Sequence, residues 1–372
     1  MTTMNNLRPI TGILTKRLPV YGIRVIASWF SPDGRDKRSK RKASADMLKT
    51  FFTALTIGGC MLMPVMQTDA AAADFPSRTV KIIVGFPAGT APDALARLVG
   101  DRLEDRLGHP VVVENVAGAA GNTAARRVAQ AEADGHTLLL AGNATLTVNQ
   151  FIYRDLGFDP SADFLLISQV AMTPNVLVVH PDIPVNTPLE LAEYARSRSG
   201  DVTYAHVGLG TSTHLAAELF ARKAGASMIA VPYTGGNAIY PDLLAGRVDV
   251  CFCNLVTSLP LIRDGKLRAL ALTSLKSVPA AAHTPTMDGS GFAGFEATAW
   301  FGLVAPAGTP AKVVERFHSE AKAVLAEEAM QARLVELAMQ PIGNSPEEFA
   351  TVVAAETQYW KGVIDAIGLK PQ

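Results

Sequence analysis

The feature that most constrains this chain is a buried-looking strand that runs into a loop of small residues. Residues 80–84 are β-branched and apolar except for Lys81, and a loop rich in glycine, proline and alanine follows them. A helix is predicted directly after the loop, with Thr90 as its N-cap and Pro92 in its first turn, where a missing N–H costs nothing. Such a helix start binds anions, because free backbone N–H groups and the helix dipole point into the loop. An ordinary strand-to-helix connection is the alternative, since the loop lacks the spacing of phosphate-binding motifs.

The same pattern recurs along the chain. Strands predicted at residues 111–113, 137–140 and 203–205 are also followed by glycine-containing loops. The carboxyl ends of strands in a parallel α/β sheet line one crevice, where ligands bind. Strands that alternate with helical stretches therefore predict an α/β fold with a ligand crevice.

Two further helices have start signals of another kind. Thr187 is followed three residues later by Glu190, and Ser345 by Glu348. A hydroxyl with a carboxylate at this spacing is the capping box, in which the side chains satisfy the helix's own first N–H groups.

Residues 1–73 differ from the rest of the chain. A basic run at residues 35–42 precedes an apolar stretch at residues 51–66, and four alanines follow before Asp74. This order predicts a secretory signal peptide, for which Met47 would be a more conventional start than Met1. The apolar stretch is shorter than the roughly 20 residues that a membrane span needs. The alternative is a lipoprotein signal with its lipid on Cys60.

Residues 74–372 carry 30 acidic and 23 basic side chains, a net charge of −7. An acidic chain argues against nucleic acid and anionic lipid as partners. It also means that an anionic ligand has to be held by local donors. These 299 residues are enough for two domains with separate cores.

Cys251 and Cys253 are the two cysteines of this part of the chain. Their spacing places them on one face of a predicted strand, and no further cysteine or histidine completes a metal site. The sequence therefore predicts two free, half-buried thiols and no bound metal.

Two histidines, His206 and His214, flank a glycine-rich loop that ends in the hydroxyl run at residues 211–213. A hydrolase would use Ser212 as its nucleophile, but His214 stands where the nucleophile elbow needs a glycine. The loop also lacks the third glycine of the dinucleotide motif, and the histidine spacing fits no zinc motif. We therefore predict no catalytic residue, metal or cofactor, and expect the hydroxyls to cap a helix and bind an oxyanion.

Several segments in combination point to one family. In chain order they are Phe86-Pro87 with Gly89 and Asp93, Glu114-Asn115 with Gly118 and Gly121-Asn122, residues 134–139, Gly208 and Gly210 with His214, residues 231–233 with Gly235, Asn254, residues 265–270, residues 300–310, and residues 346–349. Each segment is weak alone, but their order and spacing together are specific. With them the chain resembles the Bug family, the periplasmic solute receptors of tripartite tricarboxylate transporters.

The resemblance implies two α/β lobes that close on a ligand like a flytrap. The first lobe would comprise residues 74–172 and 297–372, and the second residues 173–296. The implied function is that of an exported, monomeric, non-enzymatic receptor, which captures a small organic carboxylate in the periplasm and delivers it to membrane permease subunits. An enzyme of carboxylate or acyl chemistry on the same fold, or a sensor subunit for a signalling partner, are the alternatives.

The resemblance also implies where the ligand binds. The candidate ligand-binding residues are Phe86, Ala88, Gly89, Thr90, Asp93, Asn143, His206, Gly208, Gly210, Thr211, Ser212, Tyr233 and Cys253. The chain departs from the family pattern in the first loop, at Gly85, Thr90, Ala91 and Pro92. It departs again at two positions of the second lobe, with His206 in place of a small serine and Cys253 in place of an aspartate. If both face the crevice, they favour a ligand without an ammonium group, such as a dicarboxylate or an aromatic carboxylate.

Overall fold

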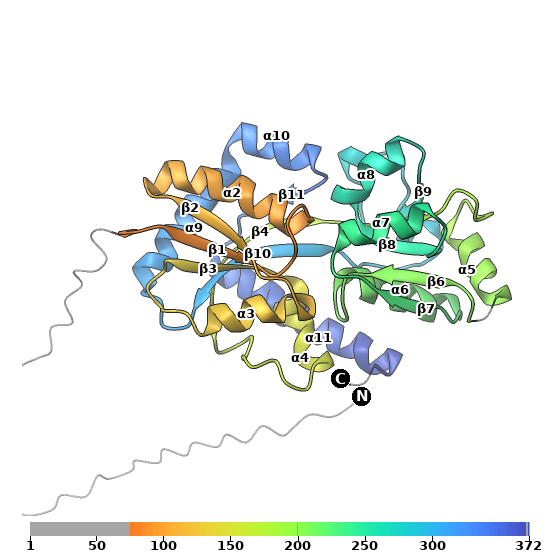
Figure 1. Ribbon diagram of the computed structural model, residues 1–372, viewed down its shortest axis with the longest axis horizontal. Helices are drawn as coiled ribbons and strands as arrows, with labels where there is room; N and C mark the ends of the chain where they lie inside the picture. The colour runs from red at the N-terminus through yellow and green to blue at the C-terminus, as the bar shows by residue number, and fades with distance from the viewer. Residues whose placement is uncertain (1–74, 199, 370, 372) are drawn as a thin grey trace, which may run out of the picture. The chain divides into compact units, whose positions relative to one another are not determined.

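The computed structural model describes residues 75–198, 200–369 and 371. The predicted signal peptide, with Met47 and Cys60, lies outside the described residues. Figure 1 shows the described strands as two separate groups. Within this part of the chain, no helix combines the length and the apolar character that a bilayer span requires.

The first sheet has six strands in the order β11-β4-β10-β3-β1-β2. Its strands are β1 (Val80–Val84), β2 (Val111–Asn115), β3 (Thr137–Gly142), β4 (Phe164–Thr173), β10 (Ala299–Pro306) and β11 (Gln340–Pro341). β1 pairs in parallel with β2 and β3, whereas β10 runs antiparallel between β3 and β4. The parallel strands β1, β2 and β3 therefore end at the same edge of this sheet.

The second sheet has five strands in the order β7-β6-β8-β5-β9. Its strands are β5 (Asn175–Val179), β6 (Thr203–His206), β7 (Ile229–Pro232), β8 (Val250–Asn254) and β9 (Arg268–Leu272). β6 pairs in parallel with β7 and β8, and β5 runs antiparallel between β8 and β9. The carboxyl ends of β6 and β8 thus also share one edge.

The chain crosses between the sheets twice. It leaves the first sheet at the end of β4 and enters the second at β5, and it returns along β10. Each sheet has its own apolar core, with Ile82 and Leu303 in one and Leu177 and Phe252 in another. The predicted two-lobe α/β fold is therefore confirmed, while the exact boundaries predicted for the lobes stay a prediction.

Helices cover both sheets. They are α2 (Ala91–Leu107), α3 (Asn122–Ala129), the π-helix η3 (Ala144–Val148), α4 (Asn149–Ile152), α5 (Pro188–Ser197), α6 (Ser212–Ala224), α7 (Gly236–Leu244), α8 (Leu255–Arg263), α9 (Ala311–Ala326), α10 (Glu328–Glu336) and α11 (Pro346–Ile367), with short 3-10 turns η2 (Ala119–Gly121), η4 (Pro279–Ala281) and η5 (Asp288–Ser290). An apolar stripe of α2 is buried at Leu95, Val99 and Leu103. It packs on the first sheet, which fixes the direction in which the N-terminus of α2 points.

The last helix, α11, joins the two cores. Near its start, Phe349 packs edge-on against Trp300 of β10, with ring centroids 5.4 Å apart. Near its end, Trp360 and Ile364 belong to the core of the second lobe. The helix therefore contacts both lobes, and any change in their angle has to act on it.

The cysteines of β8 differ from the prediction. Cys251 and Cys253 are joined by a disulfide, and their Cα atoms lie 5.2 Å apart. That separation is within the range of disulfides, and both residues are buried, at 0% and 2% exposure. The interpretation as two free, half-buried thiols was wrong.

Candidate ligand pocket

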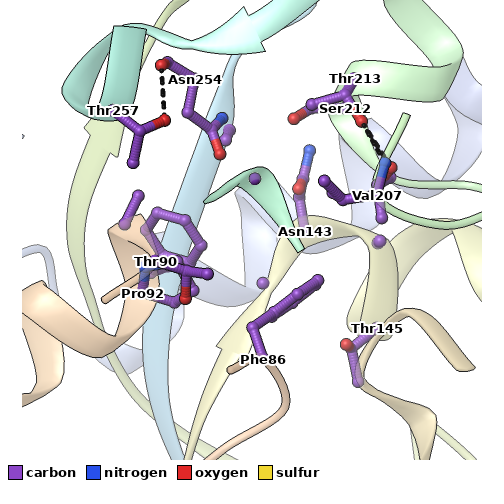
Figure 2. A pocket seen from close by; sticks show the side chains of 17 residues that line it. Phe86, Thr90, Pro92, Asn143, Thr145, Val207, Ser212, Thr213, Asn254 and Thr257 are labelled. Carbon is purple, nitrogen blue, oxygen red and sulfur yellow. Dashed lines mark hydrogen bonds between the residues drawn. The ribbon is translucent and has the colours of Figure 1, made fainter. Parts of the chain in front are cut away.

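A pocket opens where the strand ends of the two sheets meet (Figure 2). Its wall comes from the loop after β1, the end of β3, the loop after β6, the starts of α7 and α8, and the crossing strand β10. The lining residues are Phe86, Thr90, Ala91, Pro92, Gly142, Asn143, Ala144, Thr145, Val207, Thr211, Ser212, Thr213, Gly236, Asn254, Thr257, Ala299 and Phe301. Loops from both lobes thus surround one space, as the strand-end rule predicts.

The two lobes touch beside this pocket. The Asn237 side-chain amide of α7 donates to the Gly89 carbonyl at 3.2 Å, and the Tyr153 hydroxyl donates to the Leu209 carbonyl at 3.4 Å. The cavity volume is about 40 Å³. A single water needs roughly 10–15 Å³, so the space admits only a few small groups. The lobes are therefore in contact beside a small space.

The pocket wall carries no ionisable side chain. Its polar groups are hydroxyls and amides, from Thr90, Asn143, Thr145, Thr211, Ser212, Thr213, Asn254 and Thr257, and Phe86 and Phe301 supply apolar surface. No carboxylate is available in the wall to pair with a ligand ammonium. No cationic side chain neutralises a ligand anion either, so its charge would have to be met by dipoles.

Four α-helices begin at the pocket. Ala91 and Pro92 open α2, Ser212 and Thr213 open α6, Gly236 opens α7, and Asn254 is the N-cap of α8. The first N–H groups of a helix have no partner within it, and the dipole gives this end a partial positive charge. Helix starts from both lobes therefore point partial positive charge at one small space.

The side chains that could cap these helices bond elsewhere. Thr90, Thr211 and Asn254 occupy N-cap positions and make no capping hydrogen bond. The Thr90 hydroxyl donates to the Pro87 carbonyl at 2.7 Å, and the Thr211 hydroxyl donates to the Gly208 carbonyl at 2.7 Å. The Asn254 amide donates to the Asn175 side chain at 2.6 Å. The first N–H groups of α2, α6 and α8 are therefore left uncapped by these side chains.

The loop between β1 and α2 is held by hydrogen bonds to Asp93, which is 4% exposed. Its carboxylate accepts from the Gly89 N–H at 2.8 Å, from Arg97 at 3.1 Å and from Asn115 at 2.9 Å. Burial opposes ionisation of Asp93, but these hydrogen bonds and the charge of Arg97 outweigh it and hold its pKa below the usual value. Asp93 thus shapes the loop without lining the pocket.

The candidate residues divide into two groups. Phe86, Thr90, Asn143, Thr211 and Ser212 line the pocket. The remaining candidates are not among the lining residues: Ala88, Gly89, Asp93, His206, Gly208, Gly210, Tyr233 and Cys253. The Tyr233 hydroxyl, for example, donates to Asp242 at 2.8 Å, and burial together with this carboxylate raises the pKa of Tyr233 to about 12.

The departures from the family pattern at His206 and Cys253 do not reach the pocket, whereas those at Thr90, Ala91 and Pro92 line it. His206 and Cys253 are each 2% exposed and are absent from the pocket wall, where their neighbours Val207 and Asn254 take part. The positions of these two side chains therefore do not support a ligand preference based on them.

Several lining residues were not among the predicted ligand-binding residues. Gly236 and Thr257 carry no sequence signal that separates them from neighbouring positions. Asn254 and Phe301 stood in the segments that carried the family resemblance, and that signal could have identified them.

The pocket holds no arrangement typical of a hydrolase. The Ser212 hydroxyl lies 3.5 Å from the Asn175 side chain, and the His214 Nδ1 accepts from the Gly210 N–H at 3.3 Å. Within the part of the chain that the structure describes, no group of three metal-ligating side chains occurs. The polar side chains that line the pocket are neutral hydroxyls and amides.

Comparison with known proteins identifies the family. Residues 95–369 match the family described as the tripartite tricarboxylate transporter family receptor. The chain belongs to this family. Within it, the chain is 34% identical to protein BugT of Bordetella pertussis, over 82% of this chain and 94% of that protein. The family predicted from the sequence is confirmed.

Two solved structures are similar to this chain over most of its length. The chain matches R. palustris Rpa4515 with adipate at 36% identity and a TM-score of 0.78, covering 80% of this chain and all of that one. It matches MatC (Rpa3494) from Rhodopseudomonas palustris with bound malate at 31% identity and a TM-score of 0.73, covering 78% of this chain and 100% of the other. Both structures hold a dicarboxylate.

Proposed function

We propose that this receptor captures a small dicarboxylate between its lobes and hands it to the permease subunits of a tripartite tricarboxylate transporter. The observation that carries the proposal is the convergence of four helix starts from two lobes on one space whose wall has no ionisable side chain. Two opposed sets of N–H donors suit a ligand with a negative charge at each end. The malate and adipate in the related structures support this ligand class.

The pocket wall also favours a ligand without an ammonium group. An α-ammonium would be buried there with no carboxylate among the lining residues, and burying an unpaired charge is costly. Malate and aspartate share a carbon skeleton and differ at one substituent, a hydroxyl or an ammonium. Receptor binding should therefore prefer malate.

Calorimetric titration of malate, succinate, adipate and aspartate against one preparation tests this. Malate should bind at least about tenfold more tightly than aspartate, a difference of about 1.4 kcal/mol. A thermal-shift screen with the same acids provides a second readout, since ligand at about 100 times its Kd adds roughly 2.7 kcal/mol of stability. Tightest binding to aspartate would overturn the ligand class.

We propose further that the protein acts as a periplasmic monomer without turnover. Ser212 and His214 lack the geometry of a nucleophile and its base, and one similar solved structure, that of BugD, is named as a periplasmic binding protein. NMR of malate incubated with the receptor should show the ligand unchanged. N-terminal sequencing of the exported protein should give a start near Asp74, and light scattering should give the mass of one chain. Detection of a reaction product in the NMR experiment would support the enzyme alternative.

A further inference from the structure

Two buried histidines lie directly behind the pocket loop that follows β6. His206 is the last residue of β6, and His214 is in the first turn of α6. Each is 2% exposed, and their ring centroids are 4.8 Å apart. The ring of Tyr204 lies beside both, at 5.9 Å from His206 and 6.3 Å from His214. Neither imidazole lines the pocket.

Each imidazole accepts a backbone N–H from the loop between them. The Gly208 N–H donates to Nδ1 of His206 at 3.2 Å, and the Gly210 N–H donates to Nδ1 of His214 at 3.3 Å. An imidazole nitrogen accepts only when it carries no proton, so both rings are neutral, with their proton on Nε2. Burial lowers the pKa of His206, and burial followed by the nearby His206 lowers the pKa of His214 to about 3, which keeps both rings neutral near pH 7.

These contacts set the direction of the residues that do line the pocket. The Gly208 carbonyl accepts from the Thr211 hydroxyl, so Gly208 is fixed at both its N–H and its carbonyl. The next residues, Ser212 and Thr213, line the pocket, and the Thr213 hydroxyl accepts from the Val207 N–H at 3.2 Å, as the dashed line at Val207 in Figure 2 shows. The hydrogen bonds to His206 and His214 therefore fix the loop that leads into Ser212 and Thr213.

We propose that His206 and His214 are positioning residues for ligand binding, which hold the loop of residues 207–211 by accepting the Gly208 and Gly210 N–H groups and do not touch the ligand. The proposal deepens the proposed function and rests on it. It also explains why a ring that sequence reasoning placed in the pocket is buried behind it.

Substitutions can separate this acceptor role from packing. Asparagine at either position carries a side-chain oxygen at the same distance from the backbone as Nδ1, whereas leucine has similar bulk and no acceptor. His206→Leu and His214→Leu should each weaken malate binding about tenfold or more. His206→Asn and His214→Asn should stay within about threefold of the unmodified receptor. Unfolding temperatures measured alongside show whether each variant is folded.

The chain offers a matched control. The Nδ1 of His180 accepts the Asp182 N–H at 3.2 Å, which is the same two-residue spacing as His206 and Gly208, in a loop outside the pocket. His180→Leu should leave malate affinity unchanged. A similar loss of affinity in all three leucine variants would overturn a specific role for the pocket histidines.

Amide hydrogen exchange gives a readout that needs no ligand. The Gly208 and Gly210 amides should exchange about tenfold faster or more in the leucine variants and close to the unmodified rate in the asparagine variants. Unchanged exchange in the leucine variants would overturn the proposal, as would faster exchange with unchanged malate affinity. Failure of the unmodified receptor to bind any dicarboxylate would instead overturn the proposed function, and exchange would still decide whether the histidines hold the loop.

Discussion

Helix starts at the pocket and helix starts on the outer surface use the same residues in opposite ways. On the outside, the Thr187 hydroxyl of α5 accepts from the Glu190 N–H at 3.1 Å, and the Ser345 hydroxyl of α11 accepts from the Glu348 N–H at 3.2 Å. Glu348 completes the capping box by accepting from the Ser345 N–H at 2.9 Å. At the pocket, Thr90 and Thr211 hold the same N-cap position and make no such bond.

The difference affects the stability of the helices. A capping side chain contributes about 1 kcal/mol to the stability of its helix. The pocket helices forgo that contribution, and their first N–H groups stay available to a ligand oxygen. Under the proposed function, a bound carboxylate accepts from these N–H groups in place of a capping side chain. Ligand binding should therefore stabilise the receptor, and a built-in substitute for the ligand should inhibit binding.

The largest effect is expected from such a substitute, Thr90→Asp. The new carboxylate would cap α2 and place a negative charge where the ligand's charge is expected. Malate affinity should fall about 100-fold or more, about 2.7 kcal/mol, while stability is unchanged or rises by up to about 1 kcal/mol. Calorimetry and chemical denaturation measure the two quantities.

The outer counterpart of this change is Ser345→Asp, which exchanges one capping residue for another far from the pocket. It should alter neither malate affinity nor stability noticeably. Affinity within threefold of the unmodified receptor in a folded Thr90→Asp variant would mean that the ligand is not held at the start of α2.

The second prediction concerns the contact between the lobes beside the pocket. Gly89 has a φ of 76°, and a Cβ added there would lie 3.1 Å from Nδ2 of Asn237, which donates to the Gly89 carbonyl. Gly89→Val should strain the loop and oppose closure, and weaken malate binding about tenfold, or about 1.4 kcal/mol. Titration measures this loss.

Gly108 provides the control, at the other end of the same helix. Its φ is 71°, and nothing lies within 4 Å of an added Cβ. Gly108→Val should therefore bring similar backbone strain with no loss of affinity. Equal losses of affinity in the two variants would attribute the effect to general destabilisation.

The third prediction is the converse of the first, a loss of stability without a loss of binding. Ser345→Ala removes the cap of α11 and should lower the free energy of unfolding by about 1 kcal/mol. Malate affinity should stay the same, because α11 begins away from the pocket wall. Chemical denaturation and titration on the same sample check both, and Thr187→Ala repeats the test on α5. A tenfold loss of affinity in either variant would break the separation between outer and pocket helices.

The two kinds of helix start also mark how far the sequence could be read. The small-residue loops and the N-cap residues were recognisable, since residue type and spacing determine them. Whether a cap closes on its own helix was not, because Thr90 and Thr187 look alike as the residue before a helix. Only the position of the Pro87 carbonyl in the folded loop decides that the Thr90 hydroxyl turns away.

A second limit lies at strand ends, where successive side chains face opposite sides. Sequence reasoning placed His206 and Cys253 in the pocket, and the structure has Val207 and Asn254 there, one residue further on in each case. An error of one residue in where a strand ends exchanges a pocket side chain for a buried one. Residues such as Phe301, on a strand that returns from a distant part of the chain, could be assigned only through the family resemblance.

The smallest expected effect is that of salt, and its sign distinguishes the pocket from a surface site. A ligand held by exposed lysines or arginines binds more weakly as salt rises, because the ions screen the attraction. Here the wall has no charged side chain, and the helix starts act at short range inside an enclosed space. What salt can screen is the repulsion between an anionic ligand and the net charge of −7 on residues 74–372. Affinity should therefore rise slightly with salt, by about twofold or less between about 0.05 and 0.5 M sodium chloride, since the screening length is already about 10 Å at 0.1 M.

Titration of malate at several salt concentrations measures how affinity depends on salt, with a chloride-free salt as a control for competition by chloride. A steep fall in affinity would mean that cationic side chains hold the ligand, and the contrast between the two kinds of helix start would then not explain binding.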